Sequence, residues 1–119
     1  MEIDKPWGKE KLLGTYLGVY MKELYIDRHK ATSYHYHPTK DEVLYVVLGK
    51  VVIMCGEQYI ELEEGDHFFI PAGLEHSIVA KEHTIIFEIA SMAQSDTVRI
   101  RDIYGRTDTD ESGDSDIRP

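Results

Sequence analysis

The sequence has few of the features that mark secreted, membrane-bound or nucleic-acid-binding proteins. Cys55 is the only cysteine, so no intramolecular disulfide can form, which suits a reducing compartment. No apolar run is long enough for a signal peptide or for crossing a bilayer. The net charge is −9, and no stripe of Lys and Arg is present to neutralise successive phosphates. We therefore expect a cytoplasmic protein that binds neither nucleic acid nor membranes.

Amphipathic helices of crossover length are also missing, and the pattern that remains is that of short β-strands. The apolar runs are rich in Val, Ile and Tyr, alternate with a period of two, and are separated by Gly, Pro and Asp. With 119 residues, 42% of them hydrophobic, the chain can build one core. We predict an all-β sandwich or jelly-roll barrel. The expected strands are roughly Gly18–Asp27, Ser33–His37, Glu42–Leu48, Lys50–Cys55, Gln58–Leu62, His67–Ile70, His76–Ala80 and Thr84–Ser91.

The segment from Thr107 to Pro119 differs in composition from the rest of the chain. It carries five acidic residues and one arginine, with Ser, Thr and Gly among them. Segments that combine charge of one sign with few apolar residues cannot bury enough surface to fold. We predict one folded domain over residues 1–106 and a disordered acidic tail over residues 107–119.

Four side chains of metal-binding type fall at compatible strand positions. His35 and His37 lie two apart, so both imidazoles face the same side of one strand, about 7 Å apart at Cα. Glu42 opens the next strand, which returns beside the first after the turn at Pro38. His76 starts a later strand after a tight return shaped by Pro71 and Gly73. We expect His35, His37, Glu42 and His76 to share one metal ion.

Three neutral imidazoles and one carboxylate suit a divalent transition metal. Fe²⁺, Mn²⁺, Co²⁺, Ni²⁺ and Zn²⁺ all accept this ligand set, and coordination positions remain for water or substrate. If Glu42 faces inward, then Leu44, Val46 and Leu48 do so as well and form an apolar lining around the ion. The sequence leaves the identity of the metal open.

The same residues resemble the two conserved motifs of the cupin family, G(x)5HxH(x)3,4E(x)6G and G(x)5PxG(x)2H(x)3N. The spacing from His35 to Gly49 matches the first motif, and that from Gly65 to His76 matches the second. Arg28, His29 or Lys30 replaces the first motif's leading glycine, and Ala80 replaces the second motif's asparagine. The resemblance implies a double-stranded β-helix barrel with the four ligands named above.

Within the cupins, the chain looks most like type II phosphomannose isomerases and the C-terminal part of mannose-1-phosphate guanylyltransferases. Three segments carry this resemblance: Lys5–Gly8, Lys22–Ile26 and Asp102–Arg106. It implies a metal-dependent aldose–ketose isomerase that acts on a phosphorylated or nucleotide-linked sugar, and we expect a small sugar or sugar phosphate of the mannose 6-phosphate type as the substrate. Possible partners of the substrate phosphate are then Lys22, Arg28, Lys30, Arg99, Arg101 and Arg106, of which we select Lys22 and Arg106.

Such an isomerase needs a group that takes a carbon-bound proton and returns it. The first candidate is Glu88, whose pKa should rise toward the useful range if it faces the barrel interior. Ile86 shares its face, but the residues that alternate with them are equally apolar, so either orientation fits. Further candidates are Tyr34, Tyr45 and His67.

Two other functions fit the same ligands. An Fe²⁺ cupin dioxygenase, or another small metalloenzyme, needs the four ligands and an open site for O₂. A non-catalytic module could use the metal structurally or bind a sugar for sensing. Exposed Val, Ile and Tyr on the sheet faces also lead us to expect a homodimer that pairs through sheet edges.

Overall fold

Eleven strands and no helix make up the part of the chain that the structure, a computed structural model, describes: residues 1–91 and 97–101. The predicted tail over residues 107–119, the end of the predicted domain and Arg106 lie outside it. None of the described residues forms a helix with the length and apolar character that a membrane crossing needs. The strands are β1 (Glu2–Lys5), β2 (Gly8–Tyr16), β3 (Val19–Ile26), β4 (Tyr34–Tyr36), β5 (Glu42–Leu48), β6 (Lys50–Cys55), β7 (Gln58–Glu63), β8 (His67–Ile70), β9 (Ser77–Ala80), β10 (Thr84–Ser91) and β11 (Val98–Arg101).

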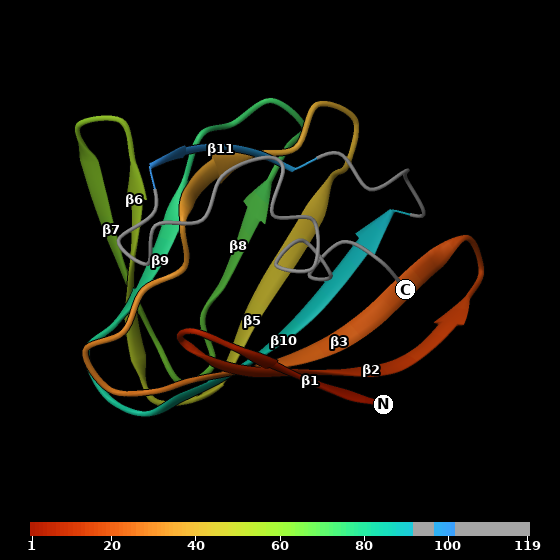
Figure 1. Ribbon diagram of the computed structural model, residues 1–119, viewed down its shortest axis with the longest axis horizontal. Helices are drawn as coiled ribbons and strands as arrows, with labels where there is room; N and C mark the ends of the chain where they lie inside the picture. The colour runs from red at the N-terminus through yellow and green to blue at the C-terminus, as the bar shows by residue number, and fades with distance from the viewer. Residues whose placement is uncertain (92–96, 102–119) are drawn as a thin grey trace.

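These strands form two main antiparallel sheets that lie on opposite sides of the interior (Figure 1). The larger sheet has the order β1-β2-β3-β10-β5-β8, and the smaller has the order β7-β6-β9. A two-stranded ribbon of β4 and β11 completes the wall, and β4 is joined to the β9 side by the bridge between His35 and His76. This arrangement confirms the predicted jelly-roll barrel.

All eight predicted strands are present, and β5, β6, β8 and β10 have the predicted bounds. The sequence did not reveal β1, β2 or β11. β1 is an edge strand of the larger sheet. β1 and the start of β2 contain many charged residues and few apolar ones. An edge that faces solvent needs no regular hydrophobic alternation, so the signal on which the prediction depended is absent there.

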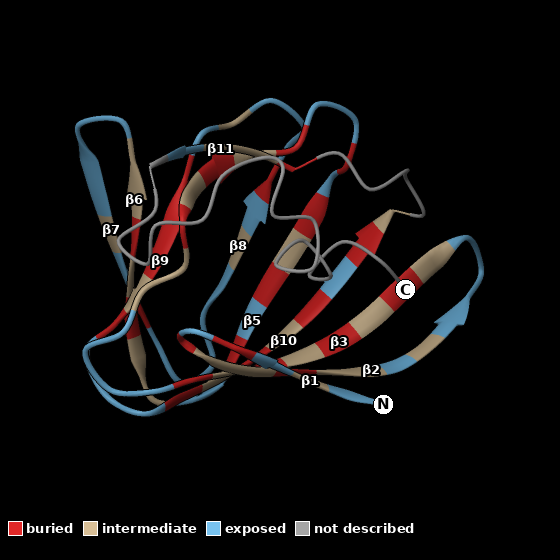
Figure 2. Cartoon of the chain, in the orientation of Figure 1, coloured by how far each residue is buried: buried red, intermediate tan, exposed pale blue. Residues whose placement is uncertain are grey.

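The barrel interior is filled from alternate positions of the strands. Buried and less buried bands alternate along β3, β5 and β10 (Figure 2). Toward one end the inward side chains are apolar, and this part of the interior holds the main core. The buried core residues are Trp7, Leu24, Ile26, Leu44, Val46, Val51, Ile53, Leu62, Ile70, Ile78, Ala80 and Ile86.

The predicted inward face of β5 is correct for Glu42, Leu44 and Val46, but wrong for Leu48, which is 44% exposed. The ladder between β5 and β10 shifts register at this point, since Ile86 pairs with Val46 while Ile85 pairs with Leu48. The extra residue in β5 forms a bulge, and a bulge reverses the facing of the residues that follow it. The apolar lining near the candidate ligands is therefore Leu44 and Val46.

The turn before β4 contains a strained residue at the position of the first motif's leading glycine. His29 has a φ of 66°, a left-handed conformation that a residue with a Cβ adopts at a cost. Backbone hydrogen bonds hold the turn, because His29 N donates to the Ala80 carbonyl (2.9 Å) and Lys30 N donates to that of Asp27 (3.0 Å). The backbone shape of the motif is thus retained without its glycine.

Candidate metal centre

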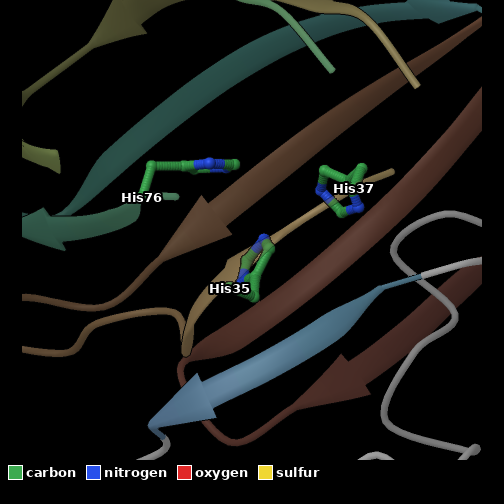
Figure 3. A group of neighbouring side chains, drawn as sticks. All are labelled: His35, His37 and His76. Atoms are coloured by element: carbon green, nitrogen blue, oxygen red, sulfur yellow. The ribbon is translucent and has the colours of Figure 1, made fainter. Parts of the chain in front are cut away.

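Three buried histidines meet in the barrel interior. His35 lies on β4, His37 follows that strand, and His76 immediately precedes β9. The backbones of His35 and His76 exchange two hydrogen bonds of 2.9 and 2.8 Å, which puts the two side chains on the same face. One potential ligand atom from each of the three residues lies within 4.8 Å of the others, and the rings converge (Figure 3). The three histidines are therefore positioned to bind one metal ion.

Each of the three histidines has a polar contact at Nδ1, and these contacts orient the rings for metal binding through Nε2. His35 Nδ1 is 2.8 Å from the Ser33 carbonyl oxygen, and His76 Nδ1 is 2.8 Å from that of Leu74. A carbonyl oxygen only accepts, so Nδ1 carries the proton in both rings and Nε2 keeps its lone pair. His37 Nδ1 lies 3.3 Å from the Thr97 hydroxyl, which precedes β11. These contacts fix the rings in the orientation that a metal ligand needs.

Glu42, the fourth predicted ligand, lies beside this cluster at the start of β5. Its Oε2 is 3.2 Å from His37 Nε2 and 3.7 Å from the Lys40 ammonium, and the side chain is buried. No residue in the described part of the chain forms a hydrogen bond with this oxygen. The Lys40 ammonium offsets the charge of this buried oxygen but makes no hydrogen bond with it, so a divalent metal would complete its contacts and the residues present fit one.

The protonation states of two of these groups also suit metal binding. Burial alone would raise the pKa of Glu42, but the Lys40 ammonium and the contact with His37 outweigh it and hold the pKa well below its usual range. Burial lowers the pKa of His76, which favours the neutral imidazole. A carboxylate and a neutral imidazole are the forms that bind metals.

Glu88, the first candidate for the proton carrier, faces the interior from β10. It is only 2% exposed, and burial raises its pKa to about 7, although the Lys40 ammonium opposes the rise. The Tyr20 hydroxyl donates to Glu88 Oε2 (3.2 Å), and Lys40 Nζ donates both to the Tyr20 hydroxyl (2.7 Å) and to the same carboxyl oxygen (3.4 Å). Glu88 is thus a fixed buried carboxyl group that titrates near neutral pH.

A cavity of about 30 Å³ joins Glu88 to the histidine cluster. Lys5, Trp7 and Arg99 are among the residues of its wall, together with the three histidines, Glu42 and Glu88. This volume holds about one or two water molecules or an ion with a water. The candidate ligands and the carboxyl group with the raised pKa therefore line one cavity.

The other predicted site residues lie elsewhere. Tyr45 is 44% exposed on the outer face of β5, and it pairs in register with the exposed His67 of β8. Neither lines the cavity, because both side chains face outward. The hypothesis that Tyr45 or His67 carries the proton is therefore wrong. Lys22 is inside the barrel, but its ammonium binds Glu10 at 2.7 Å instead of lining the cavity.

Lys40 and Tyr20 are the main site residues that the sequence did not reveal. A lysine in a turn after a proline is typical of the surface, yet Lys40 is 1% exposed. Tyr20 could have been found, because it shares its strand face with Leu24 and Ile26 at even spacing. No sequence signal marked Lys40.

Comparisons with known proteins agree with this fold and site. The sequence profile described as "Cupin domain" matches residues 24–90, a span that includes the three histidines, Glu42 and Glu88. The tetracenomycin polyketide synthase protein TcmJ of Streptomyces glaucescens is 27% identical over 67 residues, which are 54% of this chain and 45% of that protein. The match thus covers less than half the length of this curated relative.

Solved structures are similar over more of the chain. KdgF from Halomonas sp. superposes with a TM-score of 0.71 at 24% identity, over 76% of this chain and 86% of that one. An RmlC-like cupin from Shewanella frigidimarina gives a TM-score of 0.71 at 25% identity, over 79% and 85%. A cupin-2 domain protein from the same organism gives 0.64 at 28% identity, over 73% and 82%.

Proposed function

The chain belongs to the cupin family, and we propose that it is a metal-dependent isomerase that interconverts the aldose and ketose forms of a small sugar phosphate. The observation that supports this most is the position of Glu88, whose pKa is about 7, in the wall of the cavity that the three histidines line. A carboxyl group that titrates near neutral pH can both accept and return a proton.

The ligands in this proposal are His35, His37, His76 and Glu42. Their donor set suits a divalent ion of Zn, Fe, Mn, Ni or Co. When bound, such an ion polarises a carbonyl group and stabilises negative charge on its oxygen. The ligands' part is to hold their donor atoms in place, which the Nδ1 contacts of His35 and His76 achieve.

Glu88 performs the proton transfer. In the forward direction its carboxylate takes the proton from the carbon beside the aldehyde and returns it to the former aldehyde carbon. The hydroxyl proton moves between the two neighbouring oxygens, so the substrate gains and loses nothing overall. Burial favours this role, because it brings the pKa of Glu88 close to the working pH instead of leaving it near 4.5.

Tyr20 and Lys40 act as positioning residues in this proposal. Both donate hydrogen bonds to the same oxygen of Glu88, Oε2, which fixes the carboxyl group from one side. Lys40 also lies 3.7 Å from Glu42 Oε2, so one ammonium links the proton carrier to a metal ligand. The buried apolar side chains of Trp7, Leu24 and Ile78 complete the wall and limit the access of water.

The experiment measures solvent deuterium in sugar phosphates of increasing length, with protein loaded with each metal in turn. The proposal expects deuterium at the carbon next to the carbonyl, together with aldose–ketose conversion. Glu88→Gln should lower the rate by about 10²–10⁴-fold with metal content unchanged. The matched control is Glu57→Gln, at an exposed position between β6 and β7.

Three outcomes would contradict the proposal. Metal-loaded protein that consumes O₂ and loses activity without it would instead be an oxygenase. Ligand-dependent melting shifts without any turnover would indicate a binding module. Deuterium incorporation that survives Glu88→Gln at the full rate would show that another group carries the proton.

A further inference from the structure

The outer face of the larger sheet is largely apolar across four neighbouring strands, β3, β10, β5 and β8. Residues paired in register face the same side, so the outward side chains form rows across the sheet. We call these rows the outer apolar face. The first row is Met21, Ile89, Val43 and Phe69, the second is Glu23, Phe87, Tyr45 and His67, and the third is Tyr25, Ile85 and Leu48.

The outer apolar face differs in composition from the chain as a whole. The chain has 22 acidic and 13 basic residues, yet within these rows only Glu23 and His67 can carry a charge near neutral pH. Apolar side chains of the face are well exposed, with Phe69 at 53%, Tyr45 at 44% and Ile89 at 37%. Protein–protein interfaces are enriched in aromatic residues and Met and depleted in Lys, Glu and Asp. The face therefore has the composition of an interface instead of a solvated sheet surface.

The edges of the larger sheet, by contrast, are poorly suited to the edge pairing expected from the sequence. Its two edge strands, β1 and β8, have only four residues each. Glu2 and Asp4 of β1 are also exposed and carry like charges. Short edge strands and charged edge residues both discourage the addition of another strand. A partner of this sheet should therefore bind to the outer apolar face and not to an edge.

We infer that the outer apolar face is the interface between two copies of this chain. The two-fold axis lies in the interface, parallel to the strands and between β10 and β5. Rotation about it exchanges β10 with β5 and β3 with β8 within each row. Phe87 then packs against Tyr45 of the partner subunit, and Ile89 packs against Val43 of the partner subunit. The two sheets lie face to face with aligned strands, a common way for sheets to pack.

The charges of the second row favour a second copy as the occupant and select this orientation. The rotation places Glu23 opposite His67 of the partner subunit, and symmetry makes the contact twice. A carboxylate accepts a hydrogen bond from an imidazole and attracts it when the ring is protonated. An axis across the strands would instead oppose the two Glu23 carboxylates. The face is thus complementary to itself in one of these two arrangements.

Sedimentation velocity of the full-length protein over a range of concentrations tests the inference. Tyr45→Lys places an ammonium group in the second row, and Phe69→Lys places one in the first. The matched control is Tyr59→Lys, at a tyrosine of β7 in the smaller sheet that is 69% exposed. Glu23→Lys, His67→Glu and the double variant test the orientation. Circular dichroism shows whether each variant keeps the fold.

We expect the natural protein to be a dimer. Tyr45→Lys should raise its dissociation constant at least about 30-fold, because a charge without a partner would be buried at the centre of the interface. Phe69→Lys should also weaken the dimer, and Tyr59→Lys should leave it unchanged. Glu23→Lys and His67→Glu should each weaken it about threefold or more. The double variant should recover the loss, because lysine and glutamate then face each other.

Three results would overturn the inference. The first is a monomer at every concentration. The second is a dimer that Tyr45→Lys and Phe69→Lys leave intact, because the contact would then lie elsewhere. The third is a dimer in which the double variant is as weak as the single ones, or in which neither single change has an effect, because the two copies would not be related by this axis. The isomerase proposal is independent of these outcomes, since Glu42 and Glu88 face the interior.

Discussion

The two ends of the barrel interior are built by the same strands, yet one end is apolar and the other is charged. On β3, Leu24 and Lys22 are successive inward residues, and on β10 their counterparts are Ile86 and Glu88. The register pairs Ile86 with Leu24 and Glu88 with Lys22, so the change occurs across one step of the ladder, about 7 Å. The alternation along each strand determines which residues face the interior. The types of those residues determine whether that part of the interior is apolar core or a charged site.

The charged end costs stability that the apolar end must supply. Burying ions is unfavourable even when they are paired, and apolar residues of similar size are often at least as stabilising. Positions that break the hydrophobic pattern in this way are expected at functional sites. Substitutions at the apolar end should therefore mainly lower the free energy of unfolding, whereas substitutions at the charged end should mainly change metal binding and activity.

The largest expected effect is at the charged end, in His37→Ala. Removing one imidazole should reduce metal affinity by at least about 100-fold, because the remaining donors no longer enclose the ion. The variant should keep the circular dichroism of a β-protein. Elemental analysis of purified protein measures this, with His67→Ala on the outer face of β8 as the control. Full metal occupancy in His37→Ala would argue against the assigned ligands.

At the apolar end, Ile53→Ala should lower the free energy of unfolding by about 2–5 kcal/mol through the cavity it leaves. Ile53 is fully buried in the core. Urea denaturation measures the loss, and Val47→Ala, at a position 45% exposed, should change stability by less than about 0.5 kcal/mol. Metal content should stay the same in both variants. A folded Ile53→Ala protein that had lost its metal would show that the two ends are coupled.

A smaller effect, on the order of 2 kcal/mol, is expected in the pH dependence of stability. The pKa of Glu88 is about 7 in the folded protein because of burial, above its ordinary value of 4.5. The folded state therefore binds the proton more tightly than the unfolded state. The stability due to the protonated form is complete below about pH 4.5 and is lost as the pH rises through about 7.

Glu88→Gln removes this dependence, so the stability of the variant relative to the natural protein should increase between pH 5 and pH 8. Urea midpoints at both pH values measure it, with Glu57→Gln as the exposed control. If the stability of the variant relative to the natural protein were the same at pH 5 and at pH 8, folding would not raise the pKa of Glu88.

The sequence predicted the parts of this molecule that depend on local alternation and spacing. His35 and His37 share a strand face by period two, and the spacing to Glu42 and His76 matches a known pair of motifs. Leu48 was misplaced because a bulge is set by pairing with β10, which no local pattern in β5 records. The orientation of Glu88 was equally open, since both faces of β10 are apolar in sequence.

The parts that the sequence did not predict depend on contacts between distant segments. Lys40 is buried because Tyr20, 20 residues away, and Glu88, 48 residues away, accept its hydrogen bonds. Arg99 was one of several basic residues that the sequence offered as phosphate partners, and it reaches the cavity because β11 pairs with β4. Partners at this separation are a property of the fold, so only the structure reveals them.

The smallest expected effect concerns the turn that closes the apolar end after Ile26. His29→Gly should raise the free energy of unfolding by up to about 1 kcal/mol, because glycine adopts the φ of 66° without strain, although the unfolded chain gains some freedom. His29→Ala is the matched control, since alanine keeps the Cβ and should bring no gain. Urea denaturation and metal analysis measure both variants. An equal gain in stability from alanine would mean that loss of the imidazole side chain, and not relief of backbone strain, causes the effect. A gain from glycine alone, with unchanged metal content, would show that the apolar end can be stabilised without altering the charged end.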